Sequence, residues 1–247
     1  MEEGRSGSSS NGGMLYHEVQ ESQLCAVHCV NTALQGPFFS ELDLAALASD
    51  LDSQERQVLS GAFLTGDSHN VSLGGDFSIQ VLQKALAVWD LAIIRMDSPE
   101  AEPAQNDPDL ENAFICHLHD HWFCIRKVNG EWYNFDSLYP APQHLSKFYL
   151  AAYLDSLKSS GWSIFIVRGN FPNEFPISSE SSNGYGQWLS PEDAARITKS
   201  CSSSKGLQRT SQTIKQFPDP YDDLFSLSDT EDEDLKAAIA ASLVDSS

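Results

Sequence analysis

The spacing of hydrophobic positions predicts several helices in the chain. One should begin at Cys25, serine caps should precede two others at Ser40 and Ser78, and a fourth should extend over residues 146–159. Gly161 should end the last of them. The apolar stripes of these helices are expected at Ala26, Val30, Ala33 and Leu34; at Leu42, Ala45, Ala46 and Leu47; at Ile79, Leu82, Ala85 and Leu86; and at Phe148, Tyr149, Ala152 and Tyr153.

Strand patterns dominate the second half of the chain. Residues 121–128 and 131–138 are rich in aromatic side chains and are separated by Asn129-Gly130, which is a strong signal for a hairpin with a two-residue turn. Residues 97–112 are rich in Pro, Asp and Glu and should form a loop. Further buried strands are expected at residues 91–94, 113–116 and 162–167.

Composition shifts divide the chain into a folded domain and polar appendages. We predict a disordered leader over residues 1–13, the folded domain over 14–172, a flexible linker over 173–228 and a helix within 229–247.

Two segments fit this division less well. Residues 52–76 have thinly spread apolar positions and several glycines, which is typical of a mobile arm or a lid. Residues 188–195 interrupt the linker with a small apolar cluster, for which an incidental cluster is favoured over a short docking helix.

The charge balance excludes some partners. The chain of 247 residues is 41% hydrophobic, enough for a globular core, but 35 acidic against 15 basic side chains give a formal net charge of −20. This charge disfavours direct binding to nucleic acid or anionic lipid. No membrane span or secretion signal is evident. Five cysteines without a CxxC pair indicate reduced thiols, so we expect the protein to stay inside the cell.

Cys25 is the first candidate for chemistry. A lone cysteine is more often a small buried hydrophobe, but the start of a helix favours an anion, and the thiolate is the reactive form of cysteine. Gln20, just upstream, is either a polar loop residue or a donor to the oxyanion that forms when a thiolate attacks a carbonyl. Cys29 lies one turn further along, either as a resolving partner or, as we favour, as a core thiol.

The predicted hairpin supplies a base. A two-residue turn makes His121 and Asp136 diagonal neighbours on one face of the hairpin. A carboxylate in that place holds an imidazole in the tautomer that a general base needs. Asn134 shares the face but lies opposite Ile125, so it is the weaker candidate for this role.

The alternation of His117, His119 and His121 also allows a metal site. We discount this interpretation because His119-Asp120 should form a turn, and because no nearby Cys or Glu completes a ligand set. An ordinary surface or turn role is favoured for any one of these histidines. We therefore expect no metal and no other cofactor.

At the C-terminus, an acidic run over residues 229–234 leads into an apolar segment. Thr230 and Glu233 can form a capping box there, and acidic groups at its start favour a helix. One narrow stripe, whose small alanine permits close approach of a partner, then contains Leu235, Ala238, Ile239 and Ser242. The alternative is a solvated acidic tail, which does not require such a stripe.

Taken together, these segments resemble a known family. The segments Tyr16-His17-Glu18, Leu24-Cys25-Ala26, His121-Trp122-Phe123 and 132–138 occur in the order seen in the Josephin domain of ataxin-3-type deubiquitinases. The acidic run and its stripe are similar to the ubiquitin-interacting motif that follows that domain.

The resemblance implies an α+β, papain-like cysteine protease fold. It implies that Cys25 is the nucleophile, His121 the general base and acid, and Gln20 the oxyanion-hole donor. Asp136, which would orient His121, stands where the family has an asparagine. The side chain is therefore charged rather than neutral, but it still offers an oxygen that accepts a hydrogen bond.

The resemblance also implies where ubiquitin binds and where the protein works. Residues 52–76 would hold ubiquitin as a helical arm, and Leu235, Ala238, Ile239 and Ser242 would bind it again near the C-terminus. Nuclear and cytoplasmic location and transcription-linked regulation rest on the resemblance alone. The linker has no dense basic cluster, so the sequence leaves binding of the family's unfoldase partner undecided.

The sequence thus predicts a thiol-dependent deubiquitinase that trims polyubiquitin chains and acts on ubiquitylated proteins. The main alternative is a catalytically weak ubiquitin-binding adaptor, which would not need an oriented base. A metal hydrolase is a distant third.

Overall fold

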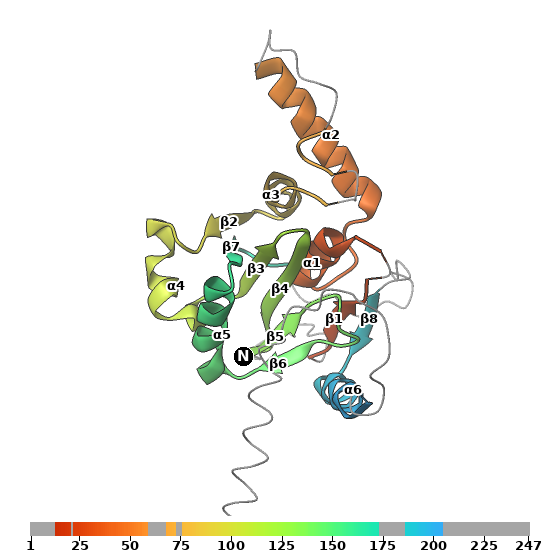
Figure 1. Ribbon diagram of the computed structural model, residues 1–247, viewed down its shortest axis with the longest axis vertical. Helices are drawn as coiled ribbons and strands as arrows, with labels where there is room; N and C mark the ends of the chain where they lie inside the picture. Colours follow the sequence, from red (N-terminus) through yellow and green to blue (C-terminus); the bar gives the residue numbers. More distant parts are fainter. Residues whose placement is uncertain (1–12, 21, 59–67, 73–75, 173–185, 205–247) are drawn as a thin grey trace, which may run out of the picture. The chain divides into compact units, whose positions relative to one another are not determined.

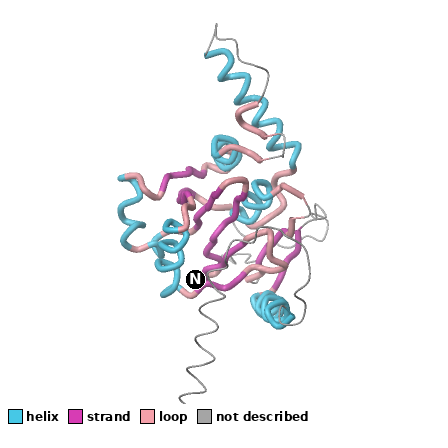
Figure 2. Tube along the Cα trace, viewed as in Figure 1, coloured by secondary structure: helices cyan, strands magenta, loops and turns pink. Residues whose placement is uncertain are grey.

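The computed structural model describes residues 13–20, 22–58, 68–72, 76–172 and 186–204 (Figure 1). The chain divides into two compact units, Met1–Ser204 and Lys205–Ser247, and every described residue belongs to the first. That unit combines antiparallel sheets with separate helices, so it belongs to the α+β class (Figure 2). Among the described helices, none has the length and apolar character needed to cross a membrane.

The main sheet is a six-stranded antiparallel sheet. Its spatial order is β2 (Leu91–Arg95), β7 (Ser163–Gly169), β3 (Ala113–Leu118), β4 (His121–Val128), β5 (Glu131–Phe135) and β6 (Gln143–Leu145). Val128 pairs with Glu131 around Asn129-Gly130, whose positive φ angles fit a two-residue hairpin turn. The predicted hairpin register is therefore confirmed. The pattern of hydrophobic and polar residues does not predict β6, because a strand of three residues is too short to show an alternation.

One face of this sheet is covered by α1 (Cys25–Leu34) and α3 (Ile79–Ala87). Every side chain of α1 is buried, which is typical of a core helix. The indole N–H of Trp122, on β4, donates to the Phe77 carbonyl at 3.1 Å and ties the sheet to the start of α3. Three of the four residues of the predicted α3 stripe are buried, Ile79 is only partly buried, and Val81 is buried although it was not predicted; the buried side chains are Val81, Leu82, Ala85 and Leu86. Ser78 precedes α3, as predicted, but its side chain makes no capping hydrogen bond; its hydroxyl donates instead to Asn70 Oδ1 at 2.8 Å.

The opposite face is covered by α5 (Lys147–Ser159), whose first turn is capped by the Ser146 hydroxyl, which accepts from the Tyr149 N–H at 3.3 Å. The predicted inward face of α5 is mostly wrong: Tyr153 is buried, but Phe148 is 96% exposed, Ala152 is exposed and Tyr149 is only partly buried. The segment contains two stripes with helical spacing, and the leucine-rich one packs on the sheet because it buries more apolar area. Its buried members are Leu150, Tyr153, Leu154 and Leu157.

Helix α2 (Glu41–Val58) begins after Ser40, as predicted. The Ser40 backbone N–H donates to Asp43 Oδ2 at 2.7 Å, and the Asp43 N–H donates to Ser40 Oγ at 3.3 Å, which is a reciprocal cap. None of the four residues of the predicted apolar face is fully buried: Leu42 is 80% exposed, Ala46 is exposed, and Ala45 and Leu47 are partly buried against the core. The buried residues are Leu44 and Ala48.

The predicted arm is partly helical. Residues 52–58 continue α2, which extends away from the main sheet in Figure 1. Residues 59–67 and 73–75 lie outside the described part of the chain. A bridge between Val71 and Phe77 then returns the chain to α3.

The segment 97–112, predicted as a loop, contains short helices instead. They are η1 (Pro99–Ala101), α4 (Glu102–Asn106) and η2 (Pro108–Leu110). Each begins with a proline in its first turn, where the fixed φ favours helical geometry and the missing N–H costs nothing. The proline content therefore starts helices here rather than preventing them.

The predicted linker also needs correction. Within it lie β8 (Gly186–Leu189) and α6 (Pro191–Ser204), and β8 pairs with β1 (Leu15–Glu18) in a separate two-stranded sheet. Tyr16 and Trp188 pack together across this pair, with ring centroids 5.1 Å apart. The cluster predicted as incidental is thus part of the compact unit. The sequence pattern does not show this, because the strand that pairs with it, β1, lies about 170 residues earlier in the chain.

Candidate active site

Cys25 is the first residue of α1, as the sequence predicts. No side chain caps this helix start, and its first turn contains no acidic residue. The dipole of α1 therefore favours negative charge at the Cys25 sulfur. Cys25 Sγ lies 3.4 Å from the backbone carbonyl oxygen of Asp120, in the turn just before β4. This contact places the thiol at the end of the sheet where His121 begins β4.

His121 and Asp136 are brought together by the hairpin. Asp136 follows the last residue of β5, and its Oδ1 lies 2.9 Å from His121 Nε2. The same oxygen accepts a hydrogen bond from the Leu138 N–H at 3.0 Å, which holds the carboxylate in place. Because Nε2 is occupied by Asp136, the other imidazole nitrogen, Nδ1, remains to interact with Cys25.

The surroundings of His121 favour its protonated form. Burial disfavours the imidazolium, but the hydrogen bonds with Asp136 and Cys25, together with their charges, outweigh that cost and raise the pKa of His121 to about 10. At neutral pH this histidine can therefore stabilise a thiolate and later donate a proton to a leaving group.

Asn134 lies on the α5 side of the sheet but does not contact His121. It pairs with Ile125 in the ladder, as predicted, and its Nδ2 donates to the hydroxyl of Tyr153 on α5 at 3.2 Å. The side chain is thus engaged away from the thiol, and Asp136 is the residue whose carboxylate reaches the imidazole.

Gln20 is tied to the residue that follows Asp136. Its backbone N–H donates to the Ser137 carbonyl at 2.9 Å, and its Oε1 accepts from the Ser137 hydroxyl at 2.8 Å. Since Oε1 is held in this way, Nε2 is the end of the amide that can donate to an oxyanion. Ser137 was not singled out from the sequence, although it lies within the motif that carries the family resemblance.

The other cysteines and histidines have structural surroundings. Cys29 is buried in the core, and burial raises its pKa well above the usual range, so it behaves as the core thiol that we favoured. His117 stacks on Trp122 with ring centroids 3.9 Å apart, and burial lowers its pKa. Across the described ranges, no group of three or more His, Cys, Asp or Glu side chains could hold a metal ion.

A buried polar network next to α1 was missed by the sequence argument. Glu18 is fully buried and lies 2.5 Å from His28 Nδ1 through its Oε2. Its other oxygen accepts from the Tyr16 hydroxyl at 2.5 Å and from Asn31 Nδ2 at 3.1 Å. The network connects β1 to the helix that carries Cys25. The only signal for it in the sequence is the set of polar residues inside an otherwise apolar helix.

The predicted C-terminal stripe of Leu235, Ala238, Ile239 and Ser242 lies outside the described residues, as do the leader and residues 205–228. Of the two predicted functional sites, the described residues therefore contain only the thiol site. A thiol at a helix start, an imidazole beside it and a carboxylate on the imidazole form an arrangement found in cysteine-dependent hydrolases on several unrelated folds.

Comparison with known proteins identifies the family. The Josephin family model matches residues 20–168. The chain is 65% identical to the ataxin-3 homolog of Arabidopsis thaliana, covering 97% of this chain and 92% of that protein. It is 62% identical to a putative ataxin-3 homolog of Oryza sativa subsp. japonica, covering 96% and 75%. Human ataxin-3 is 41% identical over 168 residues, covering 64% of this chain and 46% of the human protein.

The chain therefore belongs to the Josephin family. Josephin proteins are cysteine-protease-like deubiquitinases with a papain-like α+β fold, and the mixed helix and sheet architecture described above agrees with that fold. Family membership supports a thiol-hydrolase function and binding of ubiquitin and ubiquitylated proteins in general.

Proposed function

We propose that this protein hydrolyses the isopeptide or peptide bond at the C-terminus of ubiquitin, with Cys25 as the nucleophile. The observation that carries the proposal is the hydrogen bond of 2.9 Å between His121 and Asp136 beside the Cys25 thiol at the start of α1. In this mechanism the Cys25 thiolate attacks the carbonyl carbon, and Gln20 Nε2 donates to the oxygen that becomes negative.

His121 moves the proton. Its imidazolium protonates the leaving amine as the carbon–nitrogen bond breaks, which leaves a thioester on Cys25. The neutral imidazole then takes a proton from water, the resulting hydroxide attacks the thioester, and the Cys25 thiolate is released. Asp136 keeps the imidazole in the required tautomer throughout.

The deciding experiment uses a C-terminally activated ubiquitin probe and di-ubiquitin cleavage. Cys25→Ala should abolish both labelling and hydrolysis, whereas Cys29→Ala, the matched thiol control one turn further along α1, should still be labelled. Undiminished hydrolysis by Cys25→Ala would remove the catalytic assignment. A wild-type protein that binds ubiquitin chains but is never labelled would instead be the ubiquitin-binding adaptor.

We further propose that the C-terminal segment binds ubiquitin and helps the protein trim chains. The sequence motif supports this role. A short amphipathic helix binds ubiquitin only weakly, but because it is linked to the catalytic domain it raises the effective concentration of a bound ubiquitin chain near Cys25. In the full chain, Ala238→Gln should weaken binding of long ubiquitin chains and spare hydrolysis of a minimal ubiquitin substrate. Equal binding of ubiquitin chains by the wild type and by Ala238→Gln would show that the segment is only a solvated acidic tail.

We also propose that the protein works in both nucleus and cytoplasm, as the family resemblance suggests. Imaging a fluorescent fusion of the full chain tests this location, and exclusion of the fusion from either compartment would contradict it.

A further inference from the structure

Trp162 lies against the candidate base. The Trp162 and His121 ring centroids are 6.3 Å apart, with the rings at 79° to each other. Trp162 also meets Phe123 edge-on, at 4.9 Å and 80°. Phe123 follows His121 by two residues on β4 and lies nearly parallel to it, at 6.4 Å and 23°. Two aromatic rings therefore border the imidazole that Asp136 holds.

The backbone fixes Trp162 in this position. Gly161 directly follows Ser160, the C-cap of α5, and has a φ of +90°, in the left-handed region that disfavours residues with a side chain. The Gly161 N–H donates to the Lys158 carbonyl at 3.0 Å, and the Trp162 N–H donates to the Leu157 carbonyl at 3.0 Å. These hydrogen bonds are those of a helix C-terminal motif. Since β7 begins at the next residue, Trp162 is anchored on both sides.

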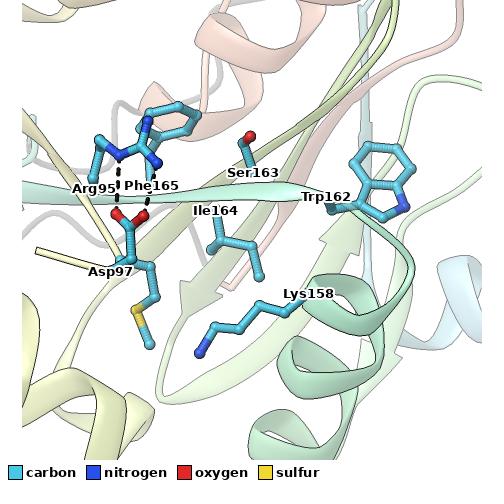
Figure 3. Close-up of a pocket in the computed structure, with 8 residues that line it drawn as sticks. Arg95, Asp97, Lys158, Trp162, Ser163, Ile164 and Phe165 are labelled. Carbon is cyan, nitrogen blue, oxygen red and sulfur yellow. Dashed lines mark hydrogen bonds and ion pairs between the residues drawn. The ribbon is translucent and has the colours of Figure 1, made fainter.

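Trp162 also lines a surface pocket of about 150 Å³ between β2, β7 and α5 (Figure 3). The charged residues of this pocket are engaged within the protein. Arg95 makes hydrogen bonds of 2.9 and 2.7 Å to Asp97, and Lys158 lies 3.7 Å from Asp155. Figure 3 shows Trp162 at the end of the pocket opposite the Arg95–Asp97 pair. The pocket thus offers no unengaged charged group for a ligand, and the titratable side chain that Trp162 contacts is His121.

We propose that Trp162 is a positioning residue that covers the His121–Asp136 hydrogen bond and holds the imidazole plane so that Nδ1 faces Cys25. A hydrogen bond to a charged group is stronger where water is excluded, and a fixed ring orientation keeps the proton path aligned. The inference rests on the proposed function only for the step that His121 performs. A purely structural role for the indole would leave the exchange of the His121 ring proton unchanged.

The test compares Trp162→Ala, Trp162→Phe and Phe148→Ala in the full chain. Phe148 is the matched control, because it is an aromatic residue at the start of α5 that is 96% exposed. Two quantities are measured: kcat and KM for a minimal ubiquitin substrate, and the exchange of the His121 Nε2–H proton with water by NMR. We expect Trp162→Ala to lower kcat about ten- to hundredfold with KM nearly unchanged, and to accelerate the exchange. Trp162→Phe should retain most of both properties, and Phe148→Ala should change neither.

Wild-type kcat and wild-type exchange in Trp162→Ala would overturn the proposal, as would equal damage from Trp162→Phe. Gly161→Ala is the second variant, used if Trp162→Ala does not fold. It strains the helix end, displaces the intact indole and should also accelerate exchange, so unchanged exchange there counts against the proposal. Exchange is measured without substrate. An inactive wild type with faster exchange in Trp162→Ala would therefore reject only the proposed function, whereas an active wild type with unchanged exchange in the variant would reject only this inference.

Discussion

Two histidine–carboxylate pairs in this protein have similar chemistry and different surroundings. His28 Nδ1 lies 2.5 Å from Glu18, with 2% and 0% of the two side chains exposed. His121 Nε2 lies 2.9 Å from Asp136, with 20% and 12% exposed. The first pair joins α1 to β1 inside the domain, and the second lies at the end of the sheet where the thiol is.

The surroundings decide what each pair can do. Both oxygens of Glu18 are occupied by donors from Tyr16, His28 and Asn31, so this carboxylate joins β1 to α1. The imidazole of His121 has one nitrogen held by Asp136 and the other available to Cys25. A fully enclosed pair serves stability, whereas a pair with one accessible nitrogen beside a thiol can transfer a proton.

The largest effect should come from Asp136→Ala. Loss of the orienting carboxylate should lower kcat for a minimal ubiquitin substrate by about 10²- to 10⁴-fold, which is the usual contribution of a positioned acid or base. KM should change little, because orientation of His121 matters chiefly in the transition state. Steady-state kinetics test this prediction. Asp136→Asn is the control, since it keeps an acceptor and should retain much of the rate; an unimpaired Asp136→Ala would remove the residue from the site.

The buried pair should dominate stability. Glu18→Ala leaves buried donors without their acceptor and should lower the free energy of unfolding by about 3–5 kcal/mol. Asp136→Ala should lower it much less, because its pair is partly solvated. Urea unfolding of both variants compares them directly. If Asp136→Ala were the more destabilising of the two, the assignment of structural and functional roles to the pairs would be reversed.

The pH dependence of stability should distinguish the His121–Asp136 pair from the fully buried pair. The pKa of His121 is raised to about 10 in the folded state, above its unfolded value of about 6.5, so its contribution is fully present below pH 6.5 and is lost as pH rises through 10. The difference in unfolding free energy between wild type and Asp136→Ala should therefore shrink between pH 7 and 10. Urea midpoints at intervals of pH measure this difference. A difference that grows with pH would contradict the raised pKa.

The smallest effect should come from Asn134→Ala. Because Asn134 donates to Tyr153 and does not reach His121, we expect kcat to fall by less than about tenfold, or about 1.4 kcal/mol. The same kinetic assay applies, with Asp136→Ala measured beside it. A slower rate in Asn134→Ala than in Asp136→Ala would make the asparagine the orienting residue.

Local sequence patterns determined much of the site. The turn residues Asn129-Gly130 set the register of the hairpin, which places Asp136 near His121. The onset of apolar periodicity places Cys25 at the start of α1, and the predicted cap Ser40 marks the start of α2. These features depend on residues a few positions apart, so turn chemistry, capping and periodicity are sufficient to predict them.

Only the tertiary structure decided which residues meet across long stretches of chain. Periodicity gives two possible faces for α5, and contact with the sheet buries Leu150 while exposing Phe148. The pairing of β8 with β1 and the packing of Trp162 on His121 join segments from distant parts of the sequence. Such contacts depend on the free energy of packing in the whole domain, which no local pattern contains.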